Sequence, residues 1–173
     1  VEALLGDIDA SVVQLEASKQ DVTAALRGFG FAALREARVE RGFELLARAD
    51  QKFAGIGPEK AFELARDPAT GSEDDRLALE GAAHVLWARQ HGASGAPEDA
   101  VRSYRQAKRC LTPRDGRALP GTLSLELAAA LAASGKVDEA RKELGQRGLE
   151  ARELSRLPEW AGQALFDNGL LGR

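Results

Sequence analysis

Apolar residues recur every three or four positions along almost the whole chain, and this spacing is that of helices with one buried face. β-Branched residues are sparse and never alternate with polar residues over a useful length, so strands are not expected. The sequence therefore predicts an all-α fold. With 173 residues, the chain has the length of one domain and can bury a core without disulfides.

Turn and capping signals divide the pattern into about eight helices joined by short connections. Pro58 and Pro97 each suit the first position of a helix. Ser72 and Asp75 have the spacing of a capping box. The expected helices cover residues 1–28, 31–53, 58–66, 72–90, 97–111, 122–134, 137–146 and 149–170, with the first ending near Gly28 and Gly30 and the last broken at Pro158.

Three of the expected helix starts are alike. They read Pro58-Glu59-Lys60-Ala61, Pro97-Glu98-Asp99-Ala100 and Val137-Asp138-Glu139-Ala140. Their alanines are 39 and 40 residues apart (100 minus 61, and 140 minus 100). A nearly fixed period of this size indicates a repeat of helical hairpins. The small alanine allows each of these helices to lie close to its neighbour.

Residues 124–152 carry a more specific pattern. Leu127-Ala128-x-x-Leu131, then Gly135, then Asp138-Glu139-Ala140-x-x-x-Leu144 resembles a tetratricopeptide repeat, although Ser124 stands where that family prefers Trp and Arg152 where it prefers Pro. A second unit matches at Ala100, Tyr104 and Ala107, with a longer turn over 91–97, and the first, over 43–65, is degenerate.

The resemblance covers residues 40–147 and implies a right-handed solenoid of antiparallel helical hairpins. We expect one all-helical domain over 1–173, with N-terminal helices over 1–40 and capping helices over 148–173. Such arrays hold a peptide or a partner helix in a groove. The form of groove that grips a C-terminal carboxylate with asparagines is not expected, because Asn168 is the only asparagine.

The charge balance argues against two classes of partner. The net charge is −3, so no overall positive field favours nucleic acid or an anionic membrane. No apolar run approaches the roughly 20 residues that span a bilayer.

Cys110 is the only cysteine, which excludes an internal disulfide and favours a cytoplasmic protein. A periplasmic location stays open, because Val1 and the absence of methionine suggest a fragment or processed product whose upstream signal was removed. The preference for Arg and Ala is typical of GC-rich bacterial coding.

Arginines concentrate in one segment. Arg102, Arg105 and Arg109 share one face of a helix, and Lys108, Arg114 and Arg117 extend the basic run. Arginine pairs with carboxylates and phosphates through two parallel hydrogen bonds, so these three residues are candidates for binding an acidic partner. The alternative is a solvated helix face. Trp87 is a further candidate contact, since Trp is enriched at binding hot spots, and core packing is its alternative, as it is for Trp160.

Catalytic and metal-binding patterns are weak. His84, His91 and Glu80 share one side of a helix but have no obvious further ligand. Cys110 falls at an inward position and is interpreted as an inert buried thiol. No phosphate-binding glycine loop or nucleophile motif is present. We therefore expect no catalytic residue, metal or cofactor.

Three functions remain, in order of preference. The first is an adaptor that binds a segment of another protein. The second is a structural subunit that self-associates, or docks in a larger complex, through its N-terminal helices. The third is an enzyme or small-ligand protein with an all-helical pocket.

Overall fold

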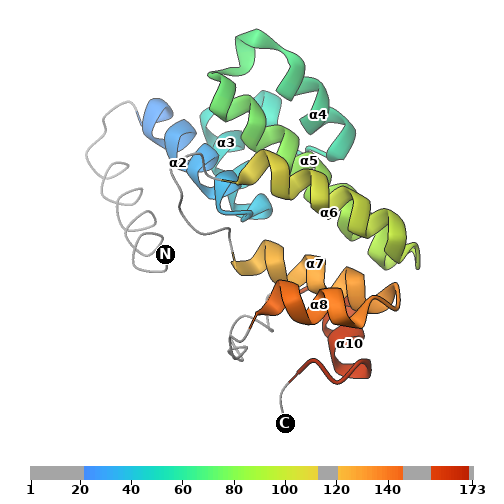
Figure 1. The fold of residues 1–173 in the computed structure, drawn as a ribbon. Helices are drawn as coiled ribbons and strands as arrows, with labels where there is room; N and C mark the ends of the chain where they lie inside the picture. Colours follow the sequence, from blue (N-terminus) through green and yellow to red (C-terminus); the bar gives the residue numbers. More distant parts are fainter. Residues whose placement is uncertain (1–21, 113–120, 146–156, 172–173) are drawn as a thin grey trace.

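The computed structural model describes residues 22–112, 121–145 and 157–171. These residues form eight α-helices and two short 3-10 helices, and no strand occurs among them (Figure 1). The elements are α2 (Thr23–Arg35), α3 (Val39–Ala49), η1 (Gln51–Phe53), α4 (Pro58–Arg66), η2 (Pro68–Thr70), α5 (Glu73–Ala93), α6 (Pro97–Leu111), α7 (Gly121–Ala133), α8 (Val137–Leu144) and α10 (Glu159–Asp167). The all-α character predicted from the periodicity is confirmed.

Local signals place several helix ends correctly. Pro58 and Pro97 begin α4 and α6, where the missing N–H of proline costs no helical hydrogen bond. Ser72 caps α5: its hydroxyl accepts from the N–H of Asp75, and the Asp75 carboxylate accepts from the N–H of Ser72. The predicted break at Pro158 is also confirmed, since α10 begins at the next residue.

The structure of the N-terminal part differs from the prediction. α2 continues through Gly28 and Gly30 to Arg35, so neither glycine ends a helix. A Cβ placed on Gly30 would lie 2.6 Å from Cγ of Leu46 in α3. Gly30 therefore lets α2 and α3 approach closely, and the helix-ending role predicted for it is wrong.

The single long helix expected over 31–53 is interrupted at Ala37, which has a φ of 55°. The N–H of Ala37 donates to the carbonyl of Leu34 at 2.9 Å, and the N–H of Arg38 donates to the carbonyl of Ala33 at 2.9 Å. These two bonds form a Schellman turn. The turn usually has glycine at its left-handed position, and alanine there gives no sequence signal.

The connection between α5 and α6 is like the one between α7 and α8. α5 runs to Ala93, beyond the expected end, and three residues separate it from α6, as three separate α7 from α8. Each connection has a left-handed glycine, Gly95 with φ 74° and Gly135 with φ 78°. The longer turn expected over 91–97 is therefore wrong, and the two turns lie 40 residues apart (135 minus 95).

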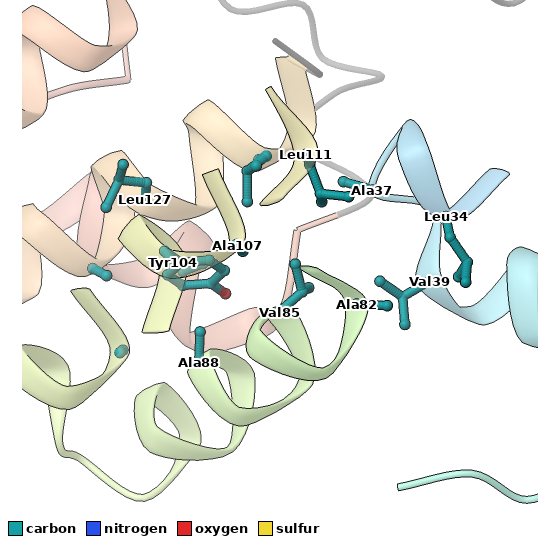
Figure 2. Close-up of a cluster of buried hydrophobic side chains, with 14 of the residues drawn as sticks. Leu34, Ala37, Val39, Ala82, Val85, Ala88, Tyr104, Ala107, Leu111 and Leu127 are labelled. Carbon is teal, nitrogen blue, oxygen red and sulfur yellow. The ribbon is translucent and has the colours of Figure 1, made fainter. Parts of the chain in front are cut away.

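The core is continuous from α2 to α10. α5 packs against α2, α4 and α6, and α7 packs against α6, α8 and α10 (Figure 1). On α7, Leu123 and every residue from Leu125 to Ala132 are buried. Figure 2 shows the ring of Tyr104 among Ala88 of α5, Ala107 of α6 and Leu127 of α7. The alanines on α5 and α6 leave space for this large side chain.

Candidate functional site

Two of the arginines selected from the sequence are engaged within α6. Arg102 forms an ion pair with Asp99, one turn earlier on the helix. The hydrogen bond and charge of Arg102 lower the pKa of the Asp99 carboxyl. Arg109 donates to the amide oxygen of Gln106 at 3.5 Å. Both arginines are exposed, and exposed contacts within one helix are weak. Arg114 and Arg117 lie outside the described residues.

The third arginine connects two helices. Arg105 donates to Glu139 of α8 at 2.9 Å. One turn further along α6, Nζ of Lys108 lies 2.7 Å from Oε1 of Glu143, which also accepts from the Ser124 hydroxyl of α7 at 3.1 Å. Two cations of the basic run, Arg105 and Lys108, therefore have carboxylate partners on α8. We use the name α6–α8 charged surface for the charged side chains just described. They are Arg102, Arg105, Lys108 and Arg109 of α6, and Glu139 and Glu143 of α8.

Trp87 lies on a different surface of the protein. The residues that contact its ring, and the one that accepts its hydrogen bond, belong to α4 and α5. The ring centroids of Phe62 and His84 are each 5.4 Å from that of Trp87, and 5.9 Å from each other. The Trp87 indole N–H donates to Glu59 at 3.2 Å. The Arg66 guanidinium lies 4.5 Å from the centroid of Phe62. These five residues form what we call the α4–α5 aromatic surface.

The three rings of this surface are each partly exposed. Burial lowers the pKa of His84, and the nearby charge of Glu80 opposes that effect only in part. The imidazole is therefore neutral at pH 7 and adds to the aromatic area. Trp87 is not a fully buried core residue, the alternative considered for it, because its ring packs on Phe62 and His84 while it stays partly exposed.

A buried ionic network was not predicted from the sequence. Arg89 of α5 donates from Nε to Oε2 of Glu126 at 2.9 Å and from Nη2 to Oε1 at 2.7 Å. The Tyr104 hydroxyl donates to Oε2 of Glu126 at 2.7 Å. Arg89 also pairs with Glu40 of α3, on the outer side of the network. Four helices are thus joined around one guanidinium.

The network is held in fixed charge states. Burial alone would lower the pKa of Arg89, but hydrogen bonding to Glu126 and the charges of Glu126 and Glu40 raise it. Burial and the charge of Glu126 raise the pKa of Tyr104. The network therefore holds a guanidinium ion and a neutral phenol at physiological pH.

The sequence did contain one signal for this network. Glu126 is the only charged residue in α7, between Leu125 and Leu127, and only 1% of its surface is exposed. A lone charge in an otherwise apolar helix requires a buried partner. Its partners lie on α5 and α6, and sequence spacing does not reveal which residues those are.

The remaining candidates are Cys110 and the possible metal ligands. Cys110 is partly rather than fully buried, and burial raises the pKa of its thiol to about 11. Among the described residues, no three His, Cys, Asp or Glu side chains converge as metal ligands. Over the same residues, no helix is both long and apolar enough to cross a membrane.

No known protein family, curated protein or solved structure matches the chain closely enough to assign a relative.

Proposed function

We propose that this chain is a protein-interaction module rather than an enzyme, and that it binds a peptide or helix of a partner protein. Its framework is an array of antiparallel helical hairpins similar to tetratricopeptide repeats. The α4–α5 aromatic surface is its principal contact, and the arginines of the α6–α8 charged surface are secondary contacts for acidic groups.

The two best-matched hairpins support the repeat framework. Ala88 and Ala128 occupy equivalent places on α5 and α7, and Ala100 and Ala140 occupy equivalent places on α6 and α8. All four are fully buried, and each pair has the 40-residue period of the turn glycines (128 minus 88, and 140 minus 100). Small residues at these places allow the two helices of a hairpin to pack closely.

The grouping of Trp87, Phe62 and His84 is the observation that carries the proposed binding role. Aromatic side chains dominate the energetics of protein interfaces, and Trp is the most enriched at hot spots. Here the rings hold one another in place, and Glu59 satisfies the indole N–H. A partner would therefore meet a surface that loses little side-chain entropy on binding.

The arginines fit a secondary role better. Arg105 and Lys108 already have carboxylate partners on α8, so an acidic ligand would have to compete with them. Rim charges of this kind affect association rate and salt dependence more than they affect affinity.

Capture of partners from native lysate tests this proposal. Four baits are compared: the native chain, Trp87→Ala, Phe62→Ala, and the triple charge reversal Arg102→Glu, Arg105→Glu and Arg109→Glu. A partner that the native chain and the triple variant retain, and that both aromatic variants lose, supports the proposed surface. Retention by the aromatic variants with loss by the triple variant would transfer the site to α6.

Self-association is the second candidate, and the N-terminal hairpin gives it a basis. Leu26 and Leu45 form a small cluster of α2 and α3, separate from the main core, and Val22, Phe29 and Ala49 pack around it while partly exposed. Light scattering over a range of concentrations tests this candidate. A native dimer that Phe29→Glu converts to monomer would favour a structural subunit, whereas a native monomer at high concentration would exclude the homo-oligomer.

A further inference from the structure

Two carboxylates lie beside the Trp87 and His84 rings of the α4–α5 aromatic surface. Glu59 accepts the indole N–H of Trp87 at 3.2 Å. Glu80 lies one turn before His84 on α5. Burial lowers the pKa of His84, and the nearby charge of Glu80 opposes this effect, so this carboxylate is close enough to act on the ring. This half of the surface is therefore negatively charged.

No cation neutralises these two carboxylates within the part of the chain that the structure describes. Neither Glu59 nor Glu80 forms a salt bridge with a described Lys or Arg. Lys60 follows Glu59 directly in the sequence, but its ammonium pairs with Glu63, 3.1 Å away. Glu59 is exposed and Glu80 is partly exposed, so a cation from outside the chain can reach both.

Arg66 shows that the rings of this surface attract a cation. Its guanidinium lies 4.5 Å from the centroid of Phe62, within the distance at which a cation is attracted to a π face. Arg66 is exposed, and no described carboxylate pairs with it, so neither core packing nor a salt bridge holds it on the ring. Trp attracts cations more strongly than Phe does, and Trp87 is partly exposed beside the two carboxylates.

We infer that the α4–α5 aromatic surface binds an arginine side chain of the partner protein, which lies over Trp87 with the carboxylates of Glu59 and Glu80 as its counter-ions. Arginine fits this place better than lysine, because a planar guanidinium stacks on a ring and donates to carboxylates at the same time. The inference rests on the proposed function, since it names the chemistry that the same surface recognises.

The charges of the surface disfavour the other two kinds of partner. An acidic group would be attracted by Arg66 alone and repelled by both Glu59 and Glu80. A wholly apolar side chain would cover the two carboxylates without giving them a counter-ion, and this desolvation is costly. A cationic side chain is the one that satisfies the rings and the carboxylates together.

Binding of helical peptides to the full chain tests this inference. The host is an uncharged peptide of alanine and glutamine, about 15 residues long, near the shortest length that forms a helix in water. Its central residue is arginine, citrulline, glutamate or leucine, and citrulline has the shape of arginine without its charge. NMR follows the two indole N–H signals, which Trp160→Phe assigns. The arginine peptide should shift the Trp87 signal saturably, and the citrulline peptide should bind at least about 3-fold more weakly.

Two variants that each remove one negative charge give a matched comparison. Glu80→Gln takes a carboxylate from the proposed site and should weaken binding of the arginine peptide at least about 2-fold. Asp138→Asn removes the same charge from α8, which packs against α7, and should leave the affinity unchanged. Circular dichroism checks that both variants are folded. Equal effects of the two variants would contradict a contact with Glu80.

The same peptides can overturn the inference in three further ways. Equal affinity of the arginine and citrulline peptides would exclude recognition of charge. Tighter binding of the glutamate peptide, lost in Arg66→Gln, would assign the surface to an acidic partner. A leucine peptide that binds at least as tightly as the arginine peptide would overturn the inference and keep the proposed function. If no peptide shifts the Trp87 signal, the inference is wrong, and capture with the aromatic-variant baits decides the proposed function separately.

Discussion

Arg89 of α5 and Glu126 of α7 are joined by two parallel hydrogen bonds, of 2.9 Å and 2.7 Å. The carboxylate is almost fully enclosed, and Tyr104 donates a third hydrogen bond to it. A buried pair of this kind fixes how helices are placed relative to one another, although apolar residues of similar size can match its stability.

We expect Glu126→Leu to lower the free energy of unfolding by about 3–5 kcal/mol, because Arg89 loses its buried counter-ion and keeps only the exposed Glu40. Combining Glu126→Leu with Arg89→Met and Tyr104→Phe removes all three polar groups and should restore most of this loss. Urea unfolding followed by circular dichroism measures both values. A triple variant no more stable than Glu126→Leu alone would show that the network itself, rather than the unpaired charge, accounts for the loss.

Substitution of two glycines of α2 by alanine should change the stability of the fold in opposite directions. Gly30→Ala should cost about 1–3 kcal/mol, because the new methyl group collides with Leu46 and the core must shift. Gly28→Ala meets no atom within 4 Å and should stabilise the helix by up to about 1 kcal/mol. Thermal unfolding of the two variants beside the native chain checks both signs. Equal destabilisation by both would contradict the close approach of α2 and α3.

His84 should make the fold sensitive to acid. Its pKa is lowered in the folded state, so the unfolded chain binds the proton more readily. The contribution of neutral His84 is complete above its ordinary pKa of about 6.5, and it is lost as the pH falls below that value toward the lowered pKa. The stability difference between the native chain and His84→Gln should therefore shrink between pH 7.5 and pH 5.5. A difference that stays constant over this range would contradict a lowered pKa.

Cys110 should react slowly with thiol reagents. Burial moves its pKa from 9.0 to about 11, which reduces the thiolate at pH 8 by about 100-fold. The rate of reaction with a colorimetric disulfide reagent should thus be on the order of 100 times lower in the folded chain than in urea. Similar rates in the two states would instead indicate an activated thiol.

The sequence predicted the fold well wherever a helix end depends on its own residues. Pro58, Pro97 and the Ser72–Asp75 capping box act through bonds within one turn, so a local pattern reveals them. The break at Ala37 was missed because the turn there uses alanine in a conformation that usually marks glycine. Gly30 was wrongly predicted to end a helix. Its role is to allow a close contact with α3, and no local sequence pattern shows such a contact.

The candidate site was less predictable. Trp87 was selected from the sequence as a candidate contact, but its neighbour Phe62 comes from another helix, and only packing of α4 on α5 brings the two rings together. The arginines were seen as one face of α6, yet the carboxylates that pair with Arg105 and Lys108 belong to α8. Contacts between different helices determine the composition of both surfaces. The spacing of residues within one helix gives no information about such contacts.

The ionic network also limits which helices could be lost independently of one another. Stability in simple repeat proteins is a sum over units and their immediate neighbours, so units can be gained or lost by duplication and deletion. Here the charge on Arg89 in α5 is balanced by Glu126 from the following hairpin and by Glu40 from a preceding one. Removing α7 would take away the buried partner of both Arg89 and Tyr104, and Arg89 would keep only the exposed Glu40. A single buried carboxylate therefore makes α7 necessary to both α5 and α6, and we expect these three helices to be retained together.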